Sequence, residues 1–367
     1  MNKDLLFYQL SLVGKALTAP FYLSKRKISF RPTFVSLETE NRCCLRCGHC
    51  DLWKKEALGS RMNLAQMKKV ILDLKDWLGF FQLNLTGGEP FLNKKIIDLI
   101  KFASEKKISV WVNSNGFVID QKLTAQIVKS GLANLSISLD SLNPRLFNHL
   151  RGNQRAWEKA VNSLRMINRS RKPRSLFLSV TCIIMKQNLE ELEKLTRWVQ
   201  KEKLDAIFFQ PIWQNFGADY RAEWFKSNQF WPDDYQKVEK AIKGLCRLKK
   251  SGYPVGNKIS DLKRFMEYFI NPIAFGRKFP CLVGVNSFNL DLSGNVRLCF
   301  NFDPVGNVLK QKPGEIWNGK LAQQQRLEIA SCQRGCQVLL CNTSLEIKET
   351  ISILMKMIKK IPGKFLR

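Results

Sequence analysis

The chain has 367 residues, of which 45% are hydrophobic and 25% are charged. These values are ordinary for a folded soluble protein of about two domains, and they exclude a disordered or collagen-like chain. The 60 basic residues against 31 acidic residues give a formal net charge of +29. Such an excess predicts an anionic partner, either a membrane surface or nucleic acid.

The first 32 residues read as a basic amphipathic arm. Ser11, Lys15 and Thr18 share one face of a helix, and leucine, valine and alanine fill most of the remainder. The apolar run 5–14 is too short to cross a bilayer, and Pro20 disrupts a signal-peptide cleavage site. We expect a cytoplasmic protein whose arm docks on the protein itself or lies at the inner face of a membrane.

Residues 33–250 alternate between strand-like and helix-like patterns. The predicted strands are 33–38, 81–85, 108–113, 135–139, 176–184 and 206–211. The predicted helices are 64–77 with an Asn63 cap, 94–106, 121–130, 155–168, 189–202 and 233–249. Apolar strands separated by helical crossovers form parallel sheets, so the pattern predicts an α/β fold, a partial (β/α)6 barrel related to the TIM barrel.

The rest of the chain predicts a connecting helix and a second, cysteine-rich unit. The connection is 251–278, with helical periodicity at 259–270, and the cysteine-rich domain is 279–345. A turn at Ser293-Gly294 separates two apolar stretches and predicts a hairpin. Residues 346–367 form a second basic amphipathic helix by pattern.

Cysteines fall into two groups that are typical of metal sites rather than of a secreted disulfide framework. Four of the eleven lie within 43–50 and five within 281–341. Cys182 and Cys246 stand apart, and we expect them to be small core residues. Cys43, Cys47 and Cys50 are spaced to surround one soft metal centre. Either His49 or Cys44 completes a zinc site, or one coordination position stays open for chemistry.

Polar motifs follow the next predicted strands in turn. They are Thr86-Gly87-Gly88-Glu89-Pro90 after the second strand, Asn115-Gly116 after the third, and Ser138-Leu139-Asp140 at the fourth. The carboxyl ends of parallel strands share one edge of the sheet, so these groups are expected around the cysteine loop. Two adjacent glycines allow backbone to approach a ligand closely, and carbonyls with Glu89 can accept hydrogen bonds from an ammonium group.

In these motifs the sequence resembles the radical S-adenosylmethionine (radical SAM) enzymes, over about residues 33–215. The resemblance implies that Cys43, Cys47 and Cys50 bind a 4Fe-4S cluster whose fourth iron takes SAM. It implies reductive cleavage of SAM to a 5′-deoxyadenosyl radical, which abstracts hydrogen from a substrate. Cys44, where the family often has Asn, departs from the pattern.

The resemblance also implies SAM-binding residues. These are His49, Thr86, Gly87, Gly88, Glu89, Pro90, Asn115, Ser138, Asp140, Arg151 and Pro211. His49 and Pro211 would lie beside the adenine, Thr86 to Pro90 would hold the amino group, and Arg151 would pair with the carboxylate. A one-electron donor such as flavodoxin or ferredoxin is expected as a partner.

The second cysteine group resembles the SPASM or twitch extensions of that family, which carry auxiliary iron–sulfur clusters. The resemblance implies one auxiliary 4Fe-4S cluster among Cys281, Cys299, Cys332, Cys336 and Cys341. Cys281 and Cys299 are expected ligands, and two of the other three complete the set. A structural zinc site is the alternative.

These features predict an enzyme whose substrate is a lipid or lipid-linked sugar, or a peptide. The two basic amphipathic ends favour work at a membrane surface. The alternatives are a tRNA-modifying radical SAM enzyme, or a non-catalytic protein that binds metal and nucleic acid. No side chain identifies itself as an acid or base for the substrate, and His49 and His149 are the only histidines.

Overall fold

The computed structural model describes residues 31–54, 61–173, 175–214, 221–278 and 281–339. The predicted arm and tail helices lie outside these residues. Six parallel strands follow one another across the sheet, from β1 to β6. Their bounds are Phe34–Glu40, Gln82–Gly87, Ser109–Ser114, Asn134–Ser138, Phe177–Ile184 and Ala206–Pro211. The predicted strands are confirmed to within a few residues at each end.

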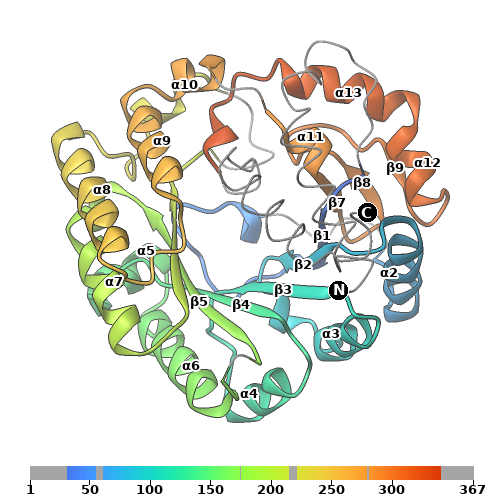
Figure 1. Ribbon diagram of the computed structural model, residues 1–367, viewed down its shortest axis with the longest axis horizontal. Coiled ribbons are helices and arrows are strands. Elements are labelled where there is room, and N and C mark those ends of the chain that lie inside the picture. The colour runs from blue at the N-terminus through green and yellow to red at the C-terminus, as the bar shows by residue number, and fades with distance from the viewer. Residues whose placement is uncertain (1–30, 55–60, 174, 215–220, 279–280, 340–367) are drawn as a thin grey trace, which may run out of the picture.

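Seven helices accompany the six strands along the chain, and all except α5 lie on the convex side of the curved sheet (Figure 1). They are α2 (Leu64–Leu78), α3 (Ile96–Glu105), α4 (Gln121–Val128), α5 (Pro144–Arg151), α6 (Ala156–Ser170), α7 (Leu192–Lys201) and α8 (Tyr235–Lys250). Asn63 caps α2 through the predicted side-chain hydrogen bond. The helix predicted at 189–202 begins as a 3₁₀ turn, η3 (Lys186–Glu191), and continues as α7.

Helix α5 was absent from the predicted elements. It has only eight residues and a polar sequence, so its periodicity is short. Its start signals are nevertheless present, because Asn143 caps the helix and Pro144 occupies the first turn. The pair Asn143-Pro144 was therefore the signal from which α5, which ends at Arg151, could have been predicted.

The two faces of the sheet differ in chemistry. The face that packs on the helices is apolar and fully buried, as at Leu37, Leu85 and Ile137. The concave face carries small polar side chains instead. These are Ser36, Asn84, Asn113, Ser136, Thr181 and Asn289, and several pair with one another across strands, as Ser136 does with Thr181 at 2.6 Å. A polar ligand therefore suits the concave side.

The C-terminal unit is joined to the barrel through the same sheet. Strand β7 (Ser287–Leu290) pairs parallel with β1, and then β8 (Asn295–Arg297) and β9 (Gly306–Asn307) continue antiparallel. The predicted hairpin is confirmed, with Gly294 at a φ of +80° in its turn. Because β1 would otherwise expose its unpaired edge, β7 gives its backbone groups hydrogen-bond partners.

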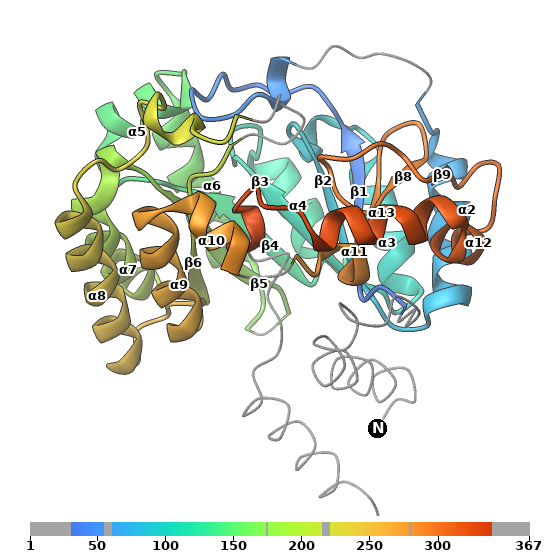
Figure 2. The ribbon, with the colours of Figure 1, turned by 90° about the horizontal axis from the view of Figure 1, so that it is seen from above.

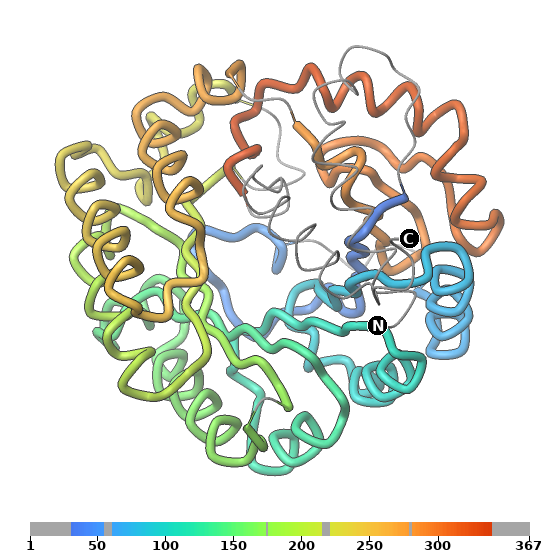
Figure 3. The backbone as a smooth tube through the Cα atoms, viewed as in Figure 1, coloured from blue at the N-terminus to red at the C-terminus, as the bar shows by residue number. Residues whose placement is uncertain are grey.

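The remaining helices close the ring from outside, as the backbone trace shows (Figure 3). They are α9 (Ile259–Ile270), α10 (Pro272–Lys278), α11 (Val283–Asn286), α12 (Pro313–Asn318) and α13 (Lys320–Ala330). The 259–270 periodicity thus predicted α9 with its observed bounds. Within the described residues, no helix is both long enough and apolar enough to cross a membrane.

Candidate active site

The loop that carries the first cysteines leaves the carboxyl end of β1 and is held by the end of α5. The backbone N–H of Arg46 donates to the carbonyl of Arg151 at 3.2 Å, and that of Gly48 donates to Leu150 at 3.1 Å. Gly152 has a φ of +62°, and a Cβ there would lie 2.5 Å from the Arg46 carbonyl oxygen. The loop conformation is therefore fixed by backbone contacts from a helix about a hundred residues away.

Cys43, Cys47 and Cys50 lie close enough to influence one another electrostatically. Burial raises the pKa of Cys47 and of Cys50, and the neighbouring Cys43 thiol raises both further. The pKa of Cys43 is lowered to about 6, first by the hydrogen bond with Cys44. The three thiols predicted as ligands lie on this one loop, with Cys47 buried and the other two half-buried.

Asn115 contacts this group from the loop after β3. Its Nδ2 lies 3.6 Å from the sulfur of Cys43 and 3.5 Å from that of Cys44. The Cys44 thiol also lies 3.8 Å from Asn115 Oδ1. Cys44, where the resembled family often has Asn, is therefore linked to the Asn115 amide rather than pointing away from the site.

The two glycines of the 86–90 loop serve a close approach between backbones. Gly87 has a φ of +138°, and a Cβ there would lie 1.8 Å from the carbonyl oxygen of Glu40. A Cβ on Gly88 would lie 2.3 Å from the carbonyl oxygen of Arg42. Sequence reasoning expected the glycines to admit a ligand, but here they let the loop hydrogen-bond to residues 40–42 at the base of the cysteine loop.

Glu89 is fully buried, and its carboxylate is used inside the protein. It accepts hydrogen bonds from Ser114 Oγ and from the backbone N–H of Asn115, both at 2.8 Å, and from the N–H of Phe91 at 3.2 Å. Burial raises the pKa of Glu89 to about 7, although these hydrogen bonds act to lower it. The carboxylate predicted to face an ammonium group instead ties the loop after β2 to the loop after β3.

Arg151 and Asp140 form a buried ion pair under the cysteine loop. Arg151 Nη2 donates to Asp140 Oδ2 at 2.5 Å, and Nη1 lies 3.8 Å from the sulfur of Cys47. Asp140 Oδ1 accepts from the N–H of Ile183 at 2.9 Å. Two of the predicted SAM residues are thus paired with each other, and among described residues Arg151 Nε has no hydrogen-bond partner.

His49 is enclosed beside the loop by the segment after β6. The ring of Phe230 lies edge-on to His49 with centroids 6.0 Å apart, and a Cβ on Gly48 would meet Phe230 at 2.7 Å. Burial lowers the pKa of His49 to about 4, so its imidazole is neutral. Its Nδ1 is buried and has no partner among the described residues. Sequence reasoning missed Phe230, which no local pattern marks.

The other predicted site residues lie at the carboxyl ends of their strands. Thr86 ends β2, with Pro90 buried in the turn that follows, while Ser138 and Pro211 end β4 and β6. The strands, the cysteine loop and α5 converge at one end of the barrel, which is uppermost in Figure 2. All eleven predicted SAM residues and the first cysteine group therefore belong to one end of the fold.

The second cysteine group lies where the hairpin meets the end of α13. Cys281 and Cys299 are buried, and Cys332 and Cys336 are half-buried. Burial raises the pKa of Cys299 to about 11, and the nearby Cys332 raises it further. Asn289 Nδ2 holds the strand before Cys299 by donating to the carbonyls of Arg297 and Leu298. Cys341 lies outside the described residues.

The spacing of the side chains bears on the kind of metal centre. Within the described ranges, no three or more His, Cys, Asp or Glu side chains are arranged to enclose a single ion. A zinc site requires four ligands at bonding distance from one ion. An iron–sulfur cluster needs thiolates further apart, because each binds a different iron. The three thiols of the first loop are soft donors, which both zinc and iron–sulfur clusters take.

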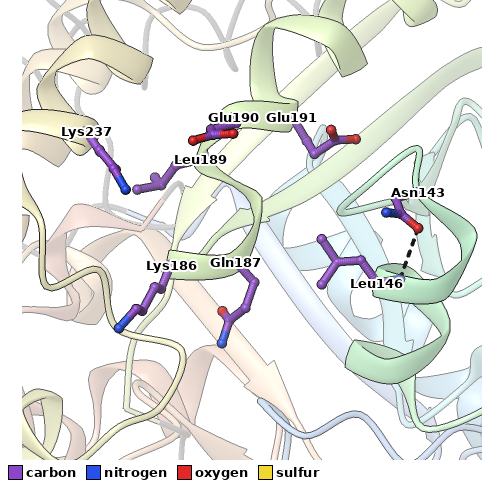
Figure 4. Close-up of a pocket in the computed structure, with 8 residues that line it drawn as sticks. All are labelled: Asn143, Leu146, Lys186, Gln187, Leu189, Glu190, Glu191 and Lys237. Carbon is purple, nitrogen blue, oxygen red and sulfur yellow. Dashed lines mark hydrogen bonds between the residues drawn. The ribbon is translucent and has the colours of Figure 1, made fainter.

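A surface pocket of about 370 Å³ lies apart from these residues (Figure 4). It is formed by α5, η3 and α8, and its lining residues are Asn143, Leu146, Lys186, Gln187, Leu189, Glu190, Glu191 and Lys237. None of the predicted site residues lines it. Glu191 from its wall accepts from Ser141 and from the N–H of Leu142, both at 3.3 Å, so the pocket wall braces the turn after Asp140.

Two family models match the chain. The radical SAM superfamily model matches residues 37–199, and the SPASM model, an iron-sulfur cluster-binding domain, matches residues 281–342. Together they cover both cysteine groups. The first domain binds a 4Fe-4S cluster with SAM, and the second binds auxiliary iron–sulfur clusters.

Individual proteins show the same likeness at low identity. A GTP 3′,8-cyclase of Peptoclostridium acidaminophilum is 25% identical over 290 residues, which are 74% of this chain and 82% of that protein. A PqqA peptide cyclase of Granulibacter bethesdensis is 24% identical over 170 residues, 46% of this chain and 44% of that protein. The crystal structure of Streptococcus suis SuiB bound to S-adenosylmethionine superposes with a TM-score of 0.64 at 16% identity, covering 87% of this chain and 76% of SuiB. The two domain matches show that this chain is a radical SAM enzyme with a SPASM-type iron–sulfur domain.

Proposed function

We propose that Cys43, Cys47 and Cys50 hold the SAM-ligated cluster and that the enzyme abstracts hydrogen from a peptide. The observation that carries the first part is the convergence of the loop that holds these three thiols with the loops after β2, β3 and β4. Glu89, Asn115 and Arg151 link those loops to one another and to the cysteine loop. Such links hold the ligand geometry without depending on the flexible side chains themselves.

The residues at this end of the barrel fit the group. Soft thiolates are the ligands that iron–sulfur clusters take, and Asn115 Nδ2 is placed to donate to a cluster-bound sulfur. Two buried nitrogens, His49 Nδ1 and Arg151 Nε, have no partner among the described residues. Buried donors and acceptors normally find partners, so both nitrogens support a ligand here.

The bound cluster and SAM would supply a 5′-deoxyadenosyl radical. The chain's own residues position and protect the site. The backbone of residues 86–90, Asn115, Ser138 and Pro211 would contact SAM. Arg151 keeps Asp140 and Cys47 as partners and offers Nε to the ligand. His49 and Phe230 cover the cysteine loop and exclude water from it.

For the second domain we propose one auxiliary 4Fe-4S cluster. Cys281 and Cys299 would be ligands with two of Cys332, Cys336 and Cys341. The support is that Cys281 and Cys299 are buried and that the Cys332 thiol raises the pKa of Cys299 through its charge. Reconstitution with iron and sulfide, followed by metal analysis, tests this assignment. Zinc retained in place of iron at this site would overturn it.

A peptide is the substrate class that the concave face favours. Amide and hydroxyl side chains line this face and bond to one another, as Asn113 does to Asn84 and Ser136 to Thr181. Each amide has more donors and acceptors than these bonds use, and an acyl chain could not pair with the remainder. A peptide backbone offers both donors and acceptors. The likeness to a PqqA peptide cyclase supports the same class, while the likeness to a GTP cyclase shows that related chains differ in substrate.

The first test is anaerobic reconstitution with SAM and dithionite, with 5′-deoxyadenosine as the product measured. We expect product from the wild type and from Cys246→Ser, whose cysteine lies outside both groups. The triple variant C43A/C47A/C50A should form no 5′-deoxyadenosine, and its bound iron should fall by the amount that one 4Fe-4S cluster contains. Product formation by the triple variant would refute the assignment of these ligands.

The second test addresses the substrate. A peptide fraction of low mass from the source cells should raise 5′-deoxyadenosine formation above the basal rate. Digestion of that fraction with a protease should remove the increase. An increase with the lipid extract, and none with the peptide fraction, would contradict a peptide substrate while leaving the radical chemistry intact.

A further inference from the structure

The end of the barrel opposite the candidate active site carries a basic rim. Each helix that returns to this end finishes with cations. They are Lys106 after α3, Lys129 after α4, Arg169 and Arg171 at the end of α6, Lys201 in α7, and Arg247, Lys249 and Lys250 in α8. Because α/β crossovers bring every helix end back to the start of the next strand, these turns share one edge.

The turns add further exposed lysines. Lys107 and Lys203 lie just before β3 and β6 at positive φ values of 59° and 56°, and Lys172 precedes β5. All three side chains are exposed, and none of them forms an ion pair with a described residue. An aromatic ring sits among them, since Phe177 at the start of β5 is 39% exposed.

Several cations at the active-site end form ion pairs. Lys54 pairs with Asp51, Lys186 with Asp233, Lys194 with Glu191, and Lys226 with Glu223. At the rim, Asp205 and Glu202 are engaged by Arg171 and Arg165, which leaves Lys107, Lys172 and Lys203 uncompensated. These three lysines give the rim a local positive charge that no ion pair among the described residues offsets.

The described chain also begins at this rim. Arg31 precedes β1, and its Nη1 donates to the carbonyl of Trp77 at the end of α2, at 2.5 Å. Residues 1–30 are thus attached here, and their sequence combines lysines and an arginine with leucines and aromatics. That composition is typical of segments that contact a membrane interface.

We infer that this basic rim binds the surface of an anionic membrane. Lysines on separate turns around one edge, with an exposed phenylalanine among them, match a flat layer of anionic headgroups. Lysines at helix ends stabilise the fold by complementing the helix dipole, so those lysines have a structural explanation. The lysines of the turns, which lie beyond the helix ends and have no ion pair with a described residue, are not explained in this way. Nucleic acid is the competing anionic partner.

The orientation has a consequence for the substrate. The strands run from the rim to the active-site end, so a membrane-bound rim turns the barrel mouth toward the aqueous phase. The substrate would then arrive from solution. The two basic ends of the sequence predicted a role at a membrane. On this inference the membrane holds the enzyme in place and does not supply its substrate. This inference does not depend on the proposed radical chemistry.

The test uses the full chain and sedimentation with phosphatidylcholine vesicles, with and without phosphatidylserine. The variant K107Q/K172Q/K203Q removes three rim charges. Each cation near an anionic surface contributes about fivefold to binding, so we expect a loss of roughly 100-fold with phosphatidylserine vesicles. The matched control, K94Q/K95Q/K122Q, removes three exposed lysines at the active-site ends of α3 and α4 and should bind as the wild type does.

Two further measurements keep the outcome decisive. K107R/K172R/K203R should restore binding, and thermal unfolding should show all variants folded. Equal binding by the rim and control variants would overturn the inference, because residues 1–30 or the tail would then account for it. Tighter binding to duplex RNA than to phosphatidylserine vesicles at the same salt would overturn it in favour of nucleic acid.

Discussion

The two cysteine groups of this enzyme are built in opposite ways. The first lies within eight residues and is fixed by backbone hydrogen bonds from α5 and from the loop after β2, while the Asn115 side chain contacts it from the loop after β3. The second spans residues 281–341 and is assembled from a hairpin, a short helix and the end of α13. The first group is therefore preorganised by the barrel, whereas the second depends on contacts between distant segments. A substitution beside one cysteine group should therefore damage that site and spare the other.

The largest effect on the first group alone should come from breaking the buried ion pair of Asp140 and Arg151 beneath it. Asp140→Ala leaves Arg151 buried without its partner, which costs about 3–5 kcal/mol of unfolding free energy. Denaturant unfolding measures this, and iron analysis should show loss at the first site. The variant D140N, which keeps the shape and the hydrogen bond to Ile183, should lose less. An unchanged midpoint for D140A would show that the pair does not hold the loop.

A glycine substitution should act next most strongly. Gly87→Ala places a Cβ against the Glu40 carbonyl and requires a φ that alanine rarely adopts, at a cost of about 3 kcal/mol. Gly252→Ala is the control, because it also has positive φ but meets no atom within 4 Å. Its cost should be about 1 kcal/mol. Similar losses for both variants would show that backbone conformation, rather than the approach of the two loops, sets the effect.

The first group should also carry a pH dependence. The pKa of Glu89 is about 7 in the folded protein and near 4.5 when unfolded. The folded state thus binds this proton more tightly, so its stabilisation is complete below pH 4.5 and is lost as pH rises through 7. The loss amounts to about 2–4 kcal/mol. Glu89→Gln should flatten the unfolding free energy across that window, and an unchanged slope in this variant would assign the dependence to other groups.

The smallest effect belongs to the second group. Asn289→Ala removes a partly buried hydrogen bond to the carbonyl of Arg297 and a buried one to that of Leu298, at a cost of about 1–2 kcal/mol of unfolding free energy. Iron bound at the second site should fall, while 5′-deoxyadenosine formed at the first site should persist. Equal loss of both would show that the hairpin supports the barrel as well, through the pairing of β7 with β1.

Local patterns determined much of this protein. Apolar periodicity gave six strands and most of the helices, Asn63 capped α2 as expected, and the spacing of Cys43, Cys47 and Cys50 indicated a soft metal centre. These features depend on residues that are neighbours in sequence. Propensity, capping and ligand spacing act over a few residues, so they can be read before the fold is known.

Only the tertiary structure decided which side chains and strands contact one another. It placed β7 beside β1, turned the Glu89 carboxylate inward, and used Gly87 for an approach between two backbones. It also brought Arg151 to Cys47 and Phe230 to His49. These contacts join residues far apart in the chain, and several chemically equivalent partners exist for each. The sequence indicated which groups meet at one end of the barrel, and packing decided which of them touch.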